Sequence, residues 1–116
     1  MLDASELANV VRETLRGSGA VREVKMFGGI GFMVNGNLIA GASKRGLLVR
    51  VGEERHGKAL KRSGARSMIM RGRTMTGFVY VDPPALTART TAAWIAFALP
   101  HVLSLPRKAG RARRKK

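Results

Sequence analysis

Short apolar segments and very short turns alternate between residues 21 and 51, and this pattern constrains the fold more than any other feature. Four segments have the length and alternation of β-strands: residues 21–27, 30–34, 38–42 and 47–51. The second and third are joined by Asn35-Gly36, the dipeptide best suited to a tight type I′ hairpin. Parallel strands need a crossover of about a dozen residues, so these connections predict an antiparallel meander.

Two further strand segments extend the predicted sheet. They span residues 68–70 and 77–81, and the basic residues 71–74 lie between them. Asp82-Pro83-Pro84 then ends the sheet, because proline has no N–H to donate to a strand ladder. We therefore expect an antiparallel sheet of about five to six strands.

Two helical segments flank or interrupt these strands. Residues 3–16 repeat apolar side chains at helical spacing, and Asp3 and Glu6 have the spacing of a capping box. Residues 53–63 form a second helical segment that is mostly polar and therefore partly exposed.

A third helix is predicted near the C-terminus. It begins at Thr87 or Thr90 and ends at Leu99 or, beyond Pro100, at Leu103. We expect Pro100 to kink or end this helix, because proline removes one backbone donor and clashes with the preceding turn.

These elements predict one α+β domain over residues 1–105 and a tail over residues 106–116. In the domain, an antiparallel meander sheet of about five to six strands is packed by an N-terminal, a middle and a C-terminal helix in two layers.

The charge of the chain is concentrated in the tail. The 116 residues include 22 Lys and Arg against 7 Asp and Glu, which gives a net charge of +15. Seven of the basic residues lie in the last ten positions, which contain no acid: Arg107, Lys108, Arg111, Arg113, Arg114, Lys115 and Lys116. Such a segment cannot bury a core, so we expect it to be disordered and to bind nucleic acid weakly and without sequence preference. The alternative is a terminus that only increases solubility.

No targeting or membrane segment is recognisable in the sequence. The N-terminus lacks the basic start and apolar stretch of a secretory signal. The longest apolar run, residues 92–99, is far shorter than the roughly 18–20 residues that a membrane-spanning helix needs. The absence of Cys fits a reducing compartment. We expect a cytoplasmic protein that does not bind a membrane.

The residues present give little support to catalytic chemistry. Without Cys, a thiol nucleophile and a Cys-ligated metal site are excluded. His56 and His101 lie far apart in the sequence, and neither belongs to a metal-binding spacing. Neither a pair of carboxylates for acid–base catalysis nor a nucleophile elbow is recognisable. We therefore expect no catalytic residues, no metal site and no cofactor.

Glycines at positions 28, 29 and 31 superficially resemble a phosphate-binding loop. Such a loop runs from a strand into a helix, whereas these glycines lie between two predicted strands. We interpret them as a bulge, a turn with positive φ, or a place where another backbone comes close. A small anion on the freed amides is the weaker alternative, and an enzyme or ligand-binding protein that uses this turn ranks last among the functional hypotheses.

Two further groups of residues have two interpretations each. Arg55, Lys58 and Arg62 form a basic stripe on the second predicted helix, which is either a solvated face or a contact surface. Six Met residues, five of them in or next to strands, either fill the core or form an adaptable surface for a partner.

Several motifs occur together in an order and spacing that resemble a known family. They are Met26-Phe27-Gly28-Gly29 followed by Gly31, Asn35-Gly36, residues 48–51, residues 77–83 with Tyr80 and Pro83, and Trp94 in the last helix. As a set, they resemble the N-terminal domain of the TfoX/Sxy family, and the resemblance covers residues 5–105.

The resemblance implies an α+β fold with an antiparallel sheet packed by helices, often self-associating as a dimer. It also implies a link to transcription, since the best-known members regulate natural competence alongside the cyclic-AMP receptor protein at promoters. Those regulators carry a second, helical C-terminal domain, whereas this sequence ends in the basic tail. The resemblance supplies no catalytic or cofactor residues. The motif residues are interpreted as structural: Met26, Phe27, Gly28, Gly29, Gly31, Tyr80, Pro83 and Trp94.

Two functional hypotheses follow from the sequence. The first is a non-enzymatic regulatory or adaptor domain that binds a protein partner of the transcription machinery close to DNA. The alternative is a nucleic-acid-binding protein whose tail supplies most of the affinity. A homodimer is also expected, because the strand-rich middle leaves at least one sheet edge that needs covering.

Overall fold

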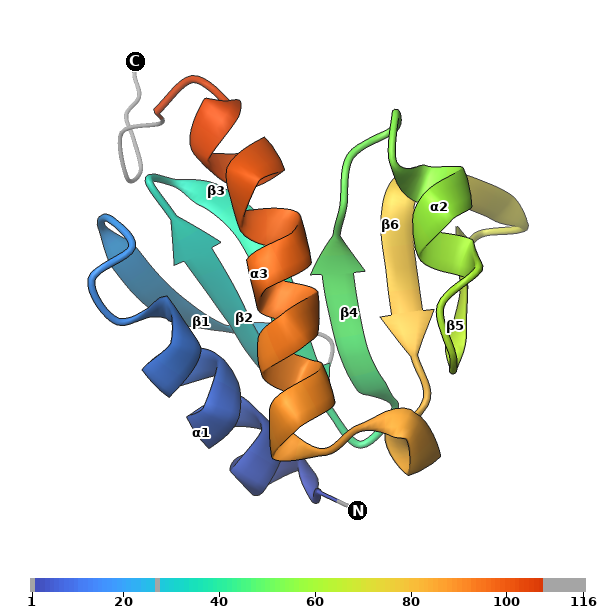
Figure 1. Ribbon diagram of the computed structural model, residues 1–116, viewed down its shortest axis with the longest axis horizontal. Coiled ribbons are helices and arrows are strands. Elements are labelled where there is room, and N and C mark those ends of the chain that lie inside the picture. The colour runs from blue at the N-terminus through green and yellow to red at the C-terminus, as the bar shows by residue number, and fades with distance from the viewer. Residues whose placement is uncertain (1, 27, 108–116) are drawn as a thin grey trace.

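The first helix begins where its capping residues predict. A computed structural model describes residues 2–26 and 28–107 of the chain, and helix α1 spans Ala4–Leu15 (Figure 1). The Asp3 carboxylate accepts a hydrogen bond from the Glu6 N–H at 2.8 Å, and the Glu6 carboxylate accepts one from the Asp3 N–H at 2.9 Å. The predicted capping box is therefore confirmed.

The chain forms one antiparallel sheet of six strands. They are β1 (Val21–Met26), β2 (Gly29–Val34), β3 (Asn37–Ser43), β4 (Gly46–Arg50), β5 (Ala65–Met70) and β6 (Arg73–Val81). The order in the sheet is β1-β2-β3-β4-β6-β5, so β6 lies beside β4 and β5 lies at the edge. The predicted fold class is confirmed, and the order of the last two strands is the feature that the sequence left open.

The turn between β2 and β3 has the predicted geometry. Asn35 has φ of 52° and Gly36 has φ of 83°, as a type I′ turn requires. Residues of β2 face residues of β3 across this turn, with Val34 opposite Asn37. This hairpin fixes the register of β2 against β3 as far as Met33, where an irregularity shifts the pairing by one residue.

The remaining helices differ in length from the sequence prediction. Helix α2 covers only His56–Leu60, because Arg55 gives it no side-chain cap and Gly57 lowers its helix propensity. A short 3₁₀ helix, η1, spans Pro83–Ala85.

Helix α3 spans Ala88–Ser104. Thr87 and Thr90 form its capping box, so the helix begins at the earlier of the two predicted positions. The prediction that it ends at Leu99 is wrong, since the helix continues through Pro100 for another turn.

All three α-helices lie on the same face of the sheet (Figure 1). Successive side chains of a strand point to opposite faces, and alternate residues of β4 and β6 pack against the helices. Leu47, Val49, Val79 and Val81 are fully buried there, together with Ile95 of α3. The molecule therefore has a helical layer and a sheet layer with the main core between them.

None of the helices in the described part of the chain combines the length and the apolarity needed to traverse a lipid bilayer.

One ion pair connects the helical layer to the edge strand β1. Arg12 of α1 donates two hydrogen bonds to the Glu23 carboxylate, at 2.6 Å from Nε and 2.7 Å from Nη2. Its guanidinium also lies 5.9 Å from the centroid of the Phe32 ring. The hydrogen bonds from Arg12 hold the pKa of Glu23 below its ordinary value. The same contact raises the pKa of Arg12.

The Glu23 pair makes stability depend on pH in a defined direction. A carboxylate whose pKa is lower in the folded state stabilises the protein above its unfolded pKa, which is 4.5 for this group. That stabilisation is lost as the pH falls through the folded-state pKa. We expect Glu23→Gln to lower the free energy of unfolding at pH 7, and we expect the difference from the original protein to shrink as the pH falls below 4.5. Urea unfolding at pH 7 and at pH 3 measures this.

Glu13→Gln is the matched control for this experiment. Glu13 pairs with Arg16 on the same helix, and 61% of its side chain is exposed, so its removal should change stability little at either pH. A loss for Glu23→Gln that persists at pH 3 would show that the effect does not come from the ionised pair.

Candidate functional site

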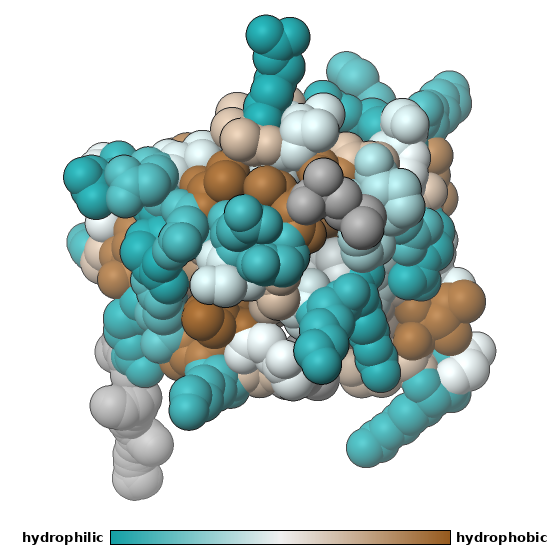
Figure 2. Space-filling model, turned by 90° about the horizontal axis from the view of Figure 1, so that it is seen from below, coloured by the Kyte–Doolittle hydropathy of each residue, from teal (hydrophilic) through white to brown (hydrophobic). Residues whose placement is uncertain are grey.

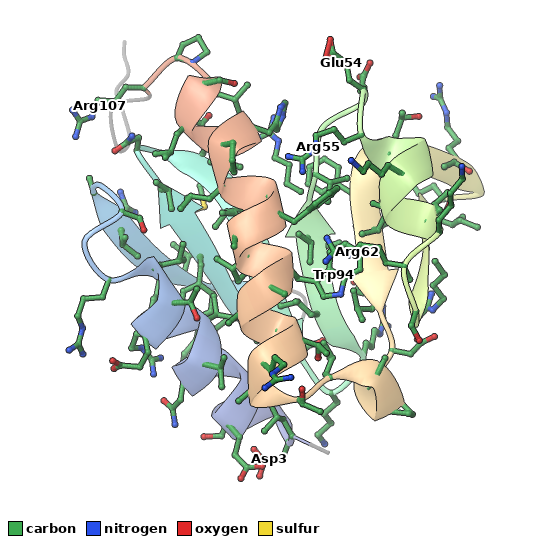
Figure 3. The ribbon with its side chains drawn as sticks, viewed as in Figure 1. Asp3, Glu54, Arg55, Arg62, Trp94 and Arg107 are labelled. Atoms are coloured by element: carbon green, nitrogen blue, oxygen red, sulfur yellow. The ribbon has the colours of Figure 1, made fainter. Side chains whose placement is uncertain are left out.

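The predicted basic stripe does not form one free face in the structure. The Arg55 guanidinium lies 3.6 Å from the centroid of the Phe97 ring on α3. The Arg62 guanidinium lies 4.8 Å from the Trp94 ring and 4.7 Å from the Phe97 ring. Both arginines are thus stacked between α2 and α3 (Figure 3), whereas Lys58 is exposed. Most of the predicted stripe connects two helices of the same chain.

Arg55 also binds the backbone of α3 beside its proline. Pro100 has no N–H, so the carbonyl of Ala96, four residues earlier, loses its helical donor. The Phe97 carbonyl, three residues earlier, accepts a hydrogen bond from Arg55 Nη1 at 2.6 Å. The Phe97 ring packs edge-on against Trp94, with centroids 6.0 Å apart. Arg55 therefore supports both the backbone and the aromatic face of α3 beside the proline.

A cleft of about 530 Å³ lies between the C-terminal part of α3, the β4–α2 loop and β6. Its lining includes Arg50, Glu53, Glu54, Arg55 and His101. Two of these side chains are already engaged, since Arg55 is bound to Phe97 and the Arg50 guanidinium lies 5.6 Å from the centroid of Phe78. The cleft is open and of mixed charge, without a geometry that specifies one reaction.

The histidines beside this cleft are placed by backbone contacts. His56 Nδ1 accepts a hydrogen bond from the Gly77 N–H at 2.8 Å, so this nitrogen carries no proton. The His101 ring packs against Gly52, where a Cβ would come within 2.7 Å of Nδ1. Among residues 2–26 and 28–107, no three His, Asp or Glu side chains are grouped closely enough to hold a metal ion.

The glycine motif is built into the hairpin of β1 and β2. Gly28 has φ of 76° in the turn between the strands. Gly29 lies so close to β3 that a Cβ would overlap the Ala42 carbonyl oxygen and approach the Ser43 Cβ to 2.7 Å. A side chain at position 29 would therefore push β2 away from β3. Phe27, also part of the motif, lies outside the described residues.

The other motif residues are distributed over both layers. The Met26 side chain lies against Gly31, and a Cβ at position 31 would overlap the Met26 sulfur. Tyr80 lies on β6 and faces away from the helices, while Trp94 is 3% exposed in the main core. Pro83 begins η1. The motif therefore does not converge on one site.

The sheet face opposite the helices carries a second apolar cluster. We call it the methionine face, and it consists of Leu48, Met68, Met70, Met75, Phe78 and Tyr80. Leu48 lies between two residues of the main core on β4, and Tyr80 lies between two such residues on β6, so both must point to the opposite face. Met26, Leu48 and Tyr80 also line a shallow hollow on this face.

The sequence left two interpretations open for the methionines, namely core filling and an adaptable surface for a partner. The methionine face has features of both. Met68 is 7% exposed and Tyr80 is 9% exposed, so the cluster is packed within itself. Met70, Met75 and Phe78 at its margin are partly buried. Sequence reasoning missed the cluster as a unit, although Leu48 and Tyr80 interrupt the helix-facing alternation of their strands and could have indicated it.

Arg107 is the only predicted tail contact within the described residues. It is exposed, and the other predicted contacts, at positions 108, 111 and 113–116, lie outside the described residues. The buried Asn37 side chain donates a hydrogen bond to the Pro106 carbonyl at 3.0 Å. This contact holds the end of the described chain beside the β2–β3 hairpin.

The different contacts of Arg55 and Lys58 lead to a stability prediction. Arg55→Ala removes a cation–π contact and a charged hydrogen bond, so we expect a loss of about 1–3 kcal/mol in the free energy of unfolding. Lys58→Ala changes an exposed side chain on the same helix and should cost less than about 0.5 kcal/mol. Urea unfolding at pH 7 measures both. Equal losses would contradict the role assigned to Arg55.

The sequence was compared with known families and proteins. It matches the family model of the TfoX N-terminal domain over residues 13–101. No match was found among curated proteins or among solved structures. The matched range begins in α1 and ends in α3, so it includes the whole sheet and the motif residues. The chain therefore belongs to the TfoX N-terminal domain family.

Proposed function

We propose that this chain is a non-enzymatic, cytoplasmic regulatory or adaptor domain that acts through protein–protein contacts. The observation that supports it best is the methionine face, an apolar cluster on the side of the sheet opposite all three α-helices. The centre of this cluster is buried, whereas Met70, Met75 and Phe78 at its margin stay partly exposed and offer apolar contact area to a partner. Membership of the TfoX N-terminal domain family supports a partner within the transcription machinery, close to DNA.

The contacts in the cleft also favour a binding role over catalysis. His56 is bonded to the backbone, and Arg55 is bound to α3. A general base must reach the proton it removes, and a lone pair that already accepts a backbone N–H does not. The polar groups beside the cleft thus support the fold.

Capture of partners from cells tests this proposal. The full chain, carrying an N-terminal affinity tag, is cross-linked in cells, digested with nuclease and purified. We expect RNA polymerase subunits or a transcription factor in amounts that nuclease does not reduce. Recovery of neither would overturn the regulatory proposal, and recovery that depends on nucleic acid would favour the alternative below.

Self-association as a homodimer is part of the same proposal. The edge strands β1 and β5 have one side without a partner strand in the described chain. On β5, 65% of Ile69 is exposed, which is unusual for a large apolar residue. Pairing of edge strands between two copies would satisfy the free backbone groups and cover this side chain.

The alternative function is non-specific nucleic-acid binding by the basic tail. It is supported by the seven basic residues in the last ten positions. Each phosphate contact contributes about 0.9 to the slope of log affinity against log salt on duplex DNA, so deleting residues 107–116 should lower that slope by several units. Fluorescence anisotropy with a duplex oligonucleotide over a salt series measures the slope.

Lys44→Ala combined with Arg45→Ala is the control for the tail deletion. Both residues are exposed in the turn between β3 and β4, so this variant removes positive charge from the domain and leaves the tail intact. It should keep most of the slope. A slope unchanged by the tail deletion would exclude the tail as the source of affinity.

A further inference from the structure

We infer that the methionine face binds an acidic amphipathic helix of a protein partner. This inference rests on the proposed function and identifies the surface and the chemistry of the contact. Its basis is the position of three arginines and an apolar cluster on one face of the sheet.

Three arginines lie on the same side of the sheet as the methionine face. Arg50 lies over the Phe78 ring, and Arg66 lies over the Tyr80 ring at 5.2 Å. Arg22 lies between Val21, which packs on the main core, and Glu23, which pairs with α1, so it points to the opposite face. The arginines are thus distributed across the sheet from β1 to β5.

The described carboxylates are located mainly away from this face. Asp3, Glu6 and Glu13 belong to α1 or its cap, and Glu23 turns toward α1. Glu53 and Glu54 line the cleft beside α3, which Arg50 and Phe78 at the end of the methionine face also line. Asp82 reaches an arginine of this face, since it accepts a hydrogen bond from Arg66 at 2.8 Å. The face therefore presents a partly exposed apolar margin and three arginines, of which Arg66 is paired with Asp82.

A surface of this composition is complementary to an acidic amphipathic segment. Apolar residues on one side of the partner helix would contact the methionines, and acidic residues beside them would reach the arginines. Methionine side chains are flexible and polarizable, which lets such a surface adapt to its partner. Figure 2 views the molecule from below, at right angles to Figure 1, and on that side hydrophobic patches are visible between extended hydrophilic side chains.

The architecture favours a helix over an added strand on this face. Strands add at sheet edges, where backbone groups are free, whereas the faces of sheets pack against helices. The opposite face of this sheet already packs against α1 and α3. A bound helix would complete a three-layer arrangement.

Two other occupants fit the face less well. Single-stranded nucleic acid binds by stacking bases on open aromatic rings, but guanidinium groups already lie over Phe78 and Tyr80. A second copy of the chain would place Arg22, Arg50 and Arg66 against the same three arginines. Both remain distinguishable outcomes of the experiment.

The experiment measures binding of designed peptides to the full chain by fluorescence anisotropy. The probe is a labelled peptide of about 18 residues with Leu at helical spacing and Glu on both sides of the apolar stripe. Its control is a scrambled peptide of equal composition and charge, which detects binding by the tail. We expect the amphipathic peptide to bind about tenfold more tightly than the scrambled one.

Charge reversals locate the binding surface. Arg50→Glu and Arg22→Glu should each weaken binding of the amphipathic peptide about tenfold. Arg89→Glu makes the same charge change at an exposed position of α3 and should have little effect. Arg22 is exposed on an edge strand, so its variant remains informative if Arg50→Glu does not fold. Circular dichroism of each variant checks the fold.

Each contrary outcome has its own signature. Equal binding of both peptides, or equal loss in all three variants, would overturn the inference in favour of diffuse charge. Competition by single-stranded DNA that depends on Arg50 and Arg22 would assign the face to nucleic acid. A dimer in light scattering that Met70→Glu dissociates would assign it to a second copy.

The cellular capture experiment separates this inference from the proposed function. We expect Arg50→Glu and Arg22→Glu to reduce recovery of the transcription partner, while Arg89→Glu leaves it unchanged. If all three variants recover the partner equally, the regulatory function stands and the methionine face is not its binding surface. If the unsubstituted chain recovers no transcription protein, the proposed function itself fails.

Discussion

The structure depends on burial of alternate side chains of β4 and β6 against α3. Leu47 and Val49 of β4 and Val79 and Val81 of β6 are fully buried in the same cluster as Ile95. Since side chains alternate across a strand, this burial also decides what faces the other way. Leu48, Phe78 and Tyr80 are turned to the opposite face by the same register, and the methionine face follows from the main core.

Local features of the structure were predictable from the sequence, because a few neighbouring residues determine them. Asp3 and Glu6 specify the start of α1, and Asn35-Gly36 specifies the first hairpin turn. The position of β6 beside β4 was not predictable in the same way, since that pairing joins segments about thirty residues apart and depends on packing of the whole core.

The candidate site was less predictable than the fold for the same reason. Arg55 and Arg62 looked like part of a solvated helix face, because the sequence of α2 does not indicate which side chains lie beside it. The rings of Phe97 and Trp94 are brought there by α3, and only this packing turns two charged residues into interhelical contacts. The hydrogen bond from Arg55 to the Phe97 carbonyl has the same origin, since it joins residues that are distant in the sequence. The glycine motif has a simpler explanation. Strand β3 comes so close to Gly29 that no side chain fits at this position.

The hydrogen bond between Asn37 and the Pro106 carbonyl fixes the position of the chain after α3. Without such a contact, the residues that follow a helix would move with its last turn. Here Pro106 is attached to the sheet beside the β2–β3 hairpin, in the half of the strand order away from β5. A label attached at the exposed Arg107 would therefore report on that half, and a probe for the β5 edge would need to be attached elsewhere.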